Sequence, residues 1–243
     1  MDTSHESVQV LEVDPGLGEG LTAAQLPAAR LSVVASVERL GTGSWHPDLD
    51  DVPQAGYLVL EGCIAREMSI LDETAAIDFL AQGDLVRPSK DAGSASVASR
   101  ATWEVLEPTR LAVLDRDFLL AVQPWPEVIA QLLKRQERRA EWLANVLAVS
   151  HLPRVELKIL VLFWQFADRW GSVRSGGVTV PIPLTHLNIA RLVGARRPTV
   201  TSALNKLIGD GLLIHEGDGH WILRGGPPSR SRDAGDAVLP TDP

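Results

Sequence analysis

The chain has 243 residues and a formal net charge of −8, and 45% of its residues are hydrophobic while 22% are charged. This composition is that of a globular protein, excludes wholesale disorder and, at this length, allows two domains. No apolar stretch approaches the roughly 18–20 residues that span a bilayer, and the acidic first residues exclude a secretory signal. The single cysteine, Cys63, excludes an internal disulfide and a four-cysteine metal site. We therefore expect a protein of the reducing cytoplasm.

Charge is distributed unevenly along the chain. Residues 1–150 carry 12 Lys/Arg and 23 Asp/Glu, whereas residues 151–232 carry 11 and 5. This asymmetry predicts an acidic module joined to a basic one that can hold a polyanion. Charge also varies along chains that bind no nucleic acid, so a motif has to support the interpretation.

The first segment, up to about Pro124, consists of short apolar runs bounded by Gly, Pro and Asp. Examples are residues 56–62, 75–81 and 109–115. Several short runs with turn residues every 8–15 positions are typical of an antiparallel sandwich or barrel. The small-residue stretch 88–99 is predicted to be a loop between two of these strands.

Residues 125–150 are predicted to form a long helix, because they contain no Gly or Pro after Pro126. A seam with heptad spacing runs along it, and Gln136 fills the one polar position. The seam consists of Ile129, Leu133, Gln136, Ala140, Leu143 and Leu147. A helix packed on its own domain would show similar periodicity, but a single polar seam residue favours a helix that pairs with a second copy.

Two further helices are predicted with a tight turn between them. A helical period covers residues 154–170, and prolines 181 and 183 make 178–184 extended. Thr185 is an expected N-cap and Gly194 an expected helix stop, with Leu187, Ile189, Leu192 and Val193 facing a core. Pro198 suits the first turn of a new helix that runs to about residue 208.

The segment after Gly211 completes the motif. Apolar residues 212–214 and 220–223 flank the turn residues 217–219, which predicts a β-hairpin. A helix-turn-helix closed by a small hairpin is a winged helix. The second helix of such a unit fits the major groove of DNA and meets base edges with its first turns.

Arginine and small hydroxyl side chains dominate those first turns. Arginine bonds guanine bidentately, and hydroxyls bond phosphates or base edges. The candidate contacts are Arg196, Arg197, Thr199, Thr201 and Ser202, with Lys206 and Arg191 farther along meeting phosphates. A winged helix that contacts only proteins, with the two arginines solvated, is the alternative.

The run from Leu184 to Leu213, preceded by Val-Pro-Ile-Pro, resembles the DNA-binding region of the bacterial Crp/Fnr family of transcription regulators. The resemblance covers residues 153–223 strongly and weaker segments upstream. It implies an α+β chain: a cyclic-nucleotide-binding-like β jelly roll (1–124), a dimerisation helix (125–150), a winged helix (151–226) and a disordered tail (227–243). A homodimer would bind a pseudo-palindrome in double-stranded DNA, and RNA polymerase is a further candidate partner. No enzyme motif, metal site or cofactor is expected.

The chain departs from the family where cyclic nucleotides bind. Arg87 and Pro88 stand where those members carry a Gly-Glu pair, and Ser99-Arg100 is one place out of register with the phosphate-binding Arg-Ser pair. We therefore expect cyclic AMP not to be bound in the usual way, and Arg87, Ser99 and Arg100 are the candidate residues for an unknown effector. Four-cysteine iron–sulfur sensing is excluded, and the scattered histidines favour surface positions over haem ligation.

The resemblance also assigns the DNA contacts. Arg197, Pro198 and Ser202 fall on the three main base-reading positions, commonly arginine, glutamate and arginine in the family, so Arg197 alone keeps a guanine-reading side chain. Thr185 and His186, at the start of the first helix, are included among the contacts. The remaining alternative is a ligand- or protein-binding module whose winged helix does not bind DNA.

Overall fold

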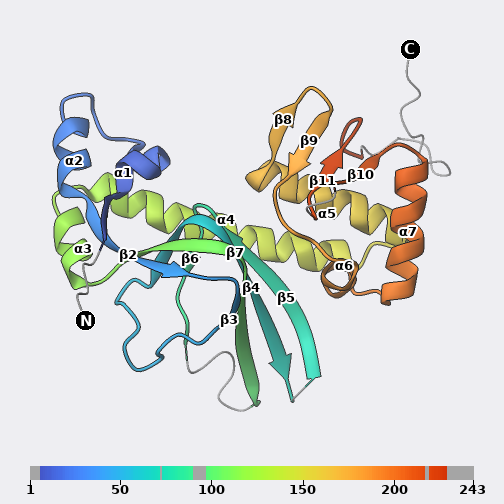
Figure 1. The fold of residues 1–243 in the computed structure, drawn as a ribbon. Helices are drawn as coiled ribbons and strands as arrows, with labels where there is room; N and C mark the ends of the chain where they lie inside the picture. The colour runs from blue at the N-terminus through green and yellow to red at the C-terminus, as the bar shows by residue number, and fades with distance from the viewer. Residues whose placement is uncertain (1–5, 72, 90–96, 217–218, 229–243) are drawn as a thin grey trace. The chain divides into compact units, whose positions relative to one another are not determined.

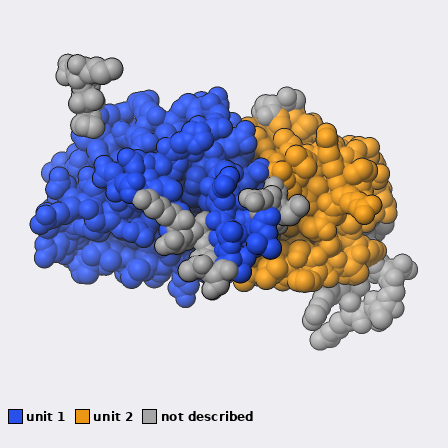
Figure 2. All heavy atoms as spheres, turned by 90° about the horizontal axis from the view of Figure 1, so that it is seen from below, with its two compact units in different colours: residues 1–141 blue, residues 142–243 orange. Residues whose placement is uncertain are grey.

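The computed structural model describes residues 6–71, 73–89, 97–216 and 219–228. The chain divides into two compact units, residues 1–141 and 142–243 (Figure 2). The division falls within the long helix α4, Pro126–Ser150, so the first part of this helix packs with unit 1 and its last turns with unit 2. The predicted tail lies outside the described residues beyond position 228.

In unit 1, the residues that the structure describes form a seven-stranded antiparallel sheet (Figure 1). The central path runs β1-β2-β7-β4-β5, while β3 pairs with β7 and β6 with β4. The strands are β1 Ser7–Gln9, β2 Val34–Leu40, β3 Gly43–Trp45, β4 Tyr57–Ile70, β5 Glu73–Ala81, β6 Leu85–Val86 and β7 Ser99–Val113. Most of the predicted loop 88–99 lies outside the described residues.

Two long neighbouring strands, β4 and β7, form the centre of the sheet and bend along their length. Their register shifts several times between Val59 and Ile64. Gly62 has φ +90, and a Cβ at this position would lie 2.4 Å from the carbonyl oxygen of Pro108. Only glycine fits so close to the facing backbone at a positive φ, so Gly62 is required where the strands bend.

The interior of this sheet is aromatic. Trp45 makes edge-to-face contacts with Tyr57 and Trp103, each at 5.7 Å between ring centroids. Ile64 and Leu80 are buried in the same cluster. A second apolar cluster packs the N-terminal helices and the start of α4 onto the sheet.

Four short helical segments of unit 1 were not predicted, because the sequence interpretation assigned this region to strands and loops alone. The N-cap of the last of them carries a local signal, since Asp115 accepts a hydrogen bond from the backbone N–H of Phe118 at 2.9 Å. The segments are α1 Val10–Val13, the 3-10 turn Pro15–Gly18, α2 Leu26–Ser32 and α3 Arg116–Val122.

The described residues of unit 2 form the last turns of α4, three further helices and a four-stranded antiparallel sheet of order β10-β11-β9-β8. Its elements after α4 are α5 Val155–Trp170, β8 Ser172–Arg174, β9 Gly177–Val180, α6 His186–Val193, α7 Arg197–Gly209, β10 Leu213–His215 and β11 Trp221–Leu223. The predicted combination of an N-terminal β domain, a long helix and a C-terminal winged helix-turn-helix is confirmed.

Candidate nucleic-acid interface

Local signals in the sequence set the geometry of the helix-turn-helix. The Thr185 hydroxyl caps α6 by accepting a hydrogen bond from the Asn188 N–H at 3.1 Å. Gly194 takes the left-handed conformation (φ 62, ψ 42), and the Ala195 N–H closes the turn onto the Ala190 carbonyl at 3.0 Å. Pro198 then lies in the first turn of α7. The turn therefore fixes how α7 leaves α6.

The wing is anchored to the same unit by one tryptophan. Trp221 of β11 is fully buried, and its indole N–H donates to the Leu184 carbonyl at 3.1 Å. Its ring meets Phe163 of α5 edge-to-face at 5.3 Å. The hydrogen bond joins the hairpin to the segment that enters α6, and the ring contact joins it to α5, so the wing packs on both helices. Residues 217 and 218 of the predicted turn lie outside the described residues.

Several predicted contact residues lie exposed at the N-terminal end of α7. Arg196, Arg197, Thr199 and Ser202 are all on the surface. The buried side of the helix is apolar and packs on the core through Val200, Ala203, Leu204 and Leu207. The exposed side of the N-terminal end of α7 is therefore cationic and has no large apolar side chain.

Thr201 is less accessible than its place among the predicted DNA contacts implies. It is half-buried, and its Oγ1 lies 3.0 Å from Nδ1 of His186 on α6. Ser202 is exposed, but its hydroxyl donates to the Pro198 carbonyl at 3.2 Å within α7. Both hydroxyls therefore already have partners inside the protein, which leaves the arginines as the main groups free to point outward.

Leu187 was predicted to face the core and is exposed at 43%. The core-facing positions of α6 are Ile189, Ala190, Leu192 and Val193, which follow the helical period. Leu187 falls on the opposite side and lines a pocket instead.

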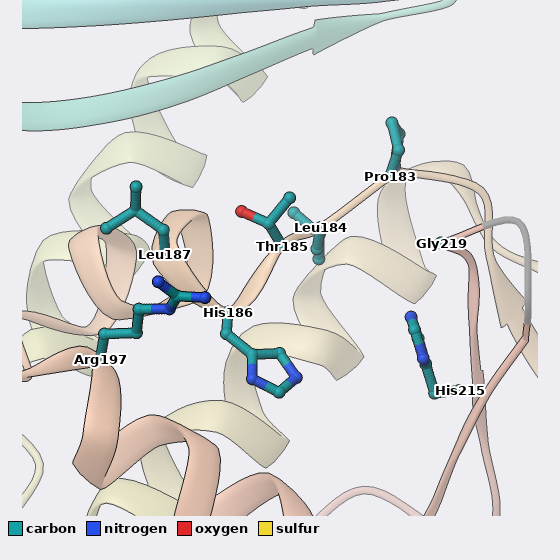
Figure 3. A pocket seen from close by; sticks show the side chains of 8 residues that line it. All are labelled: Pro183, Leu184, Thr185, His186, Leu187, Arg197, His215 and Gly219. Atoms are coloured by element: carbon teal, nitrogen blue, oxygen red, sulfur yellow. The ribbon is translucent and has the colours of Figure 1, made fainter.

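This pocket has a volume of about 570 Å³ and lies between the start of α6, the start of α7 and the wing (Figure 3). Figure 3 shows the Arg197 guanidinium beside Leu187, and the imidazoles of His186 and His215 on the same side of the segment through Leu184. His215 was not predicted as a site residue, because no local pattern indicates that β10 brings it beside α6. The lining combines a cation and two titratable rings, which suits an anion.

The pKa of His186 is lowered from its usual value. Burial is the main cause, because it penalises the charged imidazolium, and the nearby His215 and Arg197 add to the effect. His186 is therefore neutral at pH 7, and an anion bound close to it would raise its pKa.

We expect DNA binding to take up a proton at His186. Because the pKa is low in the free protein and is raised beside a phosphate, affinity for DNA should rise as the pH falls from 7.5 to 5.5, by at most about tenfold per pH unit for one proton. Fluorescence anisotropy with labelled duplex at fixed ionic strength measures this slope. His186→Gln should flatten the slope, and His151→Gln, at the exposed residue that follows α4, should keep it. Equal slopes in both variants would contradict the assignment.

Lys158 of α5 joins the ends of two other helices. Its ammonium donates to the carbonyl of Ser150, the last residue of α4, at 2.6 Å, and to that of Val193, the last residue of α6, at 3.2 Å. A cation at a helix C-terminus satisfies carbonyls that lack a partner and complements the helix dipole. Lys158 was not predicted, since its two partners are distant in sequence.

We expect Lys158→Met to lower the free energy of unfolding of unit 2 by about 1–2 kcal/mol, because two helix C-termini lose a charged donor. Urea denaturation followed by tryptophan fluorescence measures the change. Lys206→Met is the matched control: its side chain is 64% exposed and its amine lies 3.8 Å from Glu156 Oε1, so its removal should cost less than about 0.5 kcal/mol. Equal losses in the two variants would show that the carbonyl contacts contribute nothing.

The seam predicted on α4 lies on the side of the helix that faces solvent. Leu133 and Leu147 are 66% and 63% exposed, and Ile129 and Leu143 more than a third. The opposite side is buried through Val128, Leu132, Arg139, Trp142 and Val149. An apolar stripe with heptad spacing is thus left open on a helix that already has its own packed side.

The candidate effector residues are not brought together. Arg87 directly follows β6, whose Val86 pairs with Tyr57 at the start of β4. Ser99 and Arg100 pair with Ile70 and Ser69 at the far end of that 14-residue strand. Arg87 and Arg100 are both exposed. The expectation of one pocket formed by these residues therefore needs correction, because the sheet register separates them.

Cys63 is fully buried in β4, and burial raises the pKa of its thiol. A protonated, buried thiol is a poor nucleophile, which favours packing as its role.

Among the described residues, no group of three or more His, Cys, Asp or Glu side chains could hold a metal ion. Within the same part of the chain, no helix combines the length and the apolar character needed to cross a membrane.

The chain was compared with models of protein families. Residues 157–224 match the Crp-like helix-turn-helix domain. This segment runs from α5 through α6 and α7 to the end of the wing, which is the unit whose geometry is described above.

The curated relatives agree with that match. The chain is 35% identical over 112 residues to the CRP-like cAMP-activated global transcriptional regulator of Mycobacterium tuberculosis, in the strains CDC 1551 / Oshkosh and ATCC 25618 / H37Rv. The alignment covers 44% of this chain and 49% of the relative, so the chain spans about half the length of the curated relatives it matches.

Solved structures extend the likeness in fold over most of the chain. A CooA variant from Carboxydothermus hydrogenoformans has a TM-score of 0.58 at 18% identity and covers 90% of this chain and 93% of its own. FixK2 from Bradyrhizobium japonicum has a TM-score of 0.57 at 20% identity, with 79% and 93% covered. At these identities the likeness shows a shared fold.

Proposed function

We propose that this protein is a Crp/Fnr-type transcription regulator that binds a pseudo-palindromic site in double-stranded DNA as a homodimer. The observation that carries the proposal is the exposed pair Arg196 and Arg197 at the start of α7, inside a segment that matches a Crp-like helix-turn-helix domain. Guanidinium groups at the start of a recognition helix are suited to guanine and to phosphate.

The dimer is supported by the open seam on α4. Two seams that face each other would bury the exposed leucines and would relate two α7 helices by a two-fold axis. Such a dimer reads half-sites about 34 Å apart, one turn of B-DNA, which corresponds to a pseudo-palindrome.

Control by cyclic AMP in the family's usual way is not part of the proposal. Pro88 is buried and cannot hydrogen-bond a ribose hydroxyl, and Arg87 lies far along β4 from Ser99 and Arg100. The relative from Mycobacterium tuberculosis is named as cAMP-activated. For this chain we expect no enthalpy of binding when cyclic AMP is titrated at micromolar concentrations.

Selection of sites from random duplex DNA, followed by gel-shift titration at 50 and 200 mM salt, tests the function. A regulator that contacts 6–10 phosphates loses about 10³–10⁵ in affinity over this range, and the selected sites should be pseudo-palindromic. The double variant with Arg196→Ala and Arg197→Ala should bind none of them tightly. Absence of a shift at both salt concentrations would instead identify an interaction module that does not bind DNA.

A further inference from the structure

The first turn of α6 presents one large apolar side chain to solvent. Leu187 is 43% exposed, while Ile189 and Leu192 of the same helix are buried. Among the described residues of α6 and α7, the other large apolar side chain on the surface is Ile208, at the opposite end of α7. A single exposed leucine is common on proteins, so its neighbours decide whether it has a role.

The neighbour of Leu187 is the arginine expected to bond guanine. Leu187 and Arg197 line the same pocket, and the Arg197 guanidinium lies beside the Leu187 side chain (Figure 3). The two residues belong to the first turns of α6 and α7, and the tight turn at Gly194 joins these helices. A base that bonds Arg197 therefore brings its neighbour in the stack close to the methyl groups of Leu187.

Leu187 differs in chemistry from the polar side chains around it. The Thr185 hydroxyl accepts from the Asn188 N–H at 3.1 Å. Nδ1 of His186 lies 3.0 Å from the Thr201 hydroxyl. Leu187 has no donor, so packing it on a phosphate would remove water from the phosphate oxygens without replacing their hydrogen bonds. The complement of this side chain is an apolar group on the DNA.

The major groove offers one such group. Thymine carries a C5-methyl there, and apolar side chains read it by direct contact. This methyl projects on the side of the base that is nearest its own sugar–phosphate backbone. The first helix of a helix-turn-helix crosses the backbone while the second enters the groove. A side chain on the first turn of α6, beside Arg197, is therefore placed to meet a thymine methyl at the edge of the groove.

We propose that Leu187 is a specificity-determining residue that reads the methyl of a thymine adjacent to the guanine bonded by Arg197. The inference rests on the proposed DNA binding and names part of the sequence that such binding selects. Each half-site should contain a thymine in a base pair next to that guanine. Burying one methyl-sized group corresponds to about a fourfold change in affinity, the equivalent of about 0.8 kcal/mol.

The experiment uses the full-length chain and duplexes selected from random DNA. The guanine in question is the one whose preference Arg197→Ala relaxes. Deoxyuridine replaces the adjacent thymine in both half-sites, which removes the methyl and keeps the Watson–Crick edge. We expect about a 16-fold loss of affinity by fluorescence anisotropy, fourfold from each half-site. 5-Bromodeoxyuridine should restore affinity to within twofold, because bromine has nearly the volume of a methyl group.

Leu187→Ala should bind the thymine duplex about 16-fold more weakly than the parent chain and should no longer distinguish thymine from deoxyuridine. Because Leu187 is exposed, the variant should fold like the parent chain. Thr199→Ser is the matched control: Thr199 is exposed at the start of α7, and this change removes a methyl while it keeps the hydroxyl. Its ratio of affinities for thymine and deoxyuridine should equal that of the parent chain.

Three results would overturn the assignment while the parent chain still binds its selected duplex, so that the proposed function stands. The first is a deoxyuridine effect that persists in Leu187→Ala. The second is an effect that disappears in Thr199→Ser, which would make Thr199 the reader of the methyl. The third is a selected half-site with no thymine beside the guanine, or one that is indifferent to deoxyuridine. Absence of binding to any duplex would overturn the proposed function and this inference together.

Discussion

Leu147→Glu is expected to convert a dimer into a folded monomer. Leu147 is 63% exposed in the single chain, so a carboxylate there has little effect on the protomer. In a paired seam the same carboxylate is buried beside that of its symmetry mate, which costs about 3 kcal/mol or more. Light scattering coupled to size-exclusion chromatography should show the mass of one chain, and affinity for the pseudo-palindrome should fall by 100-fold or more.

Ala144→Glu is the matched control, because Ala144 is exposed on α4 next to the seam but not part of it. This variant should remain dimeric and bind the full site normally. Binding of Leu147→Glu to an isolated half-site should match that of the parent chain, since the substitution lies on α4 and leaves α6, α7 and the wing unchanged. A Leu147→Glu protein that stays dimeric would place the pairing surface elsewhere.

The seam shows what the sequence could and could not predict about α4. Heptad spacing was visible in the pattern, and the same pattern allowed a helix packed on its own domain. The structure shows both features: one side of α4 packs on its own chain, and the apolar seam lies on the opposite, exposed side. The inward side was missed because it is rich in polar side chains, such as Gln131, Arg135 and Arg139, whose partners lie far away in sequence.

Elements set by local chemistry were predicted well. Thr185, Gly194 and Pro198 each act within a few residues of their own position, as a cap, a left-handed turn and a first-turn residue. The contacts between elements were not predictable in this way. The His186–Thr201 contact joins two helices, and Asp78 of β5 accepts from both Arg66 of β4 and Arg139 of α4. Such contacts depend on the fold and leave no periodic signature.

The effector residues illustrate the same limit. Arg87, Ser99 and Arg100 were grouped because they stand near a motif in sequence, but pairing along β4 separates them. Strand register decides which residues meet, and a single sequence does not fix register over a 14-residue strand with several bulges.

Arg197→Ala is expected to cost about 1–3 kcal/mol in binding to the selected site and to relax preference at one guanine per half-site. Arg197 is exposed at the first position of α7 and lines the pocket beside α6. Thr201 is engaged with His186, and the Ser202 hydroxyl with its own helix, so neither replaces a bidentate guanidinium. Pro198 has no donor or acceptor on its side chain.

Lys206→Ala separates base reading from attraction to phosphate. Its amine is largely exposed and only loosely paired with Glu156, so its loss should weaken all sequences alike and make the salt dependence shallower by about one unit of slope. Competition titrations against every single-base variant of the half-site, at two salt concentrations, distinguish the two effects. If Arg197→Ala leaves the base preferences unchanged and only flattens the salt dependence, Arg197 is a phosphate contact. Base reading would then fall to Arg196, the other exposed guanidinium at the start of α7, or specificity would rest on the shape of the DNA.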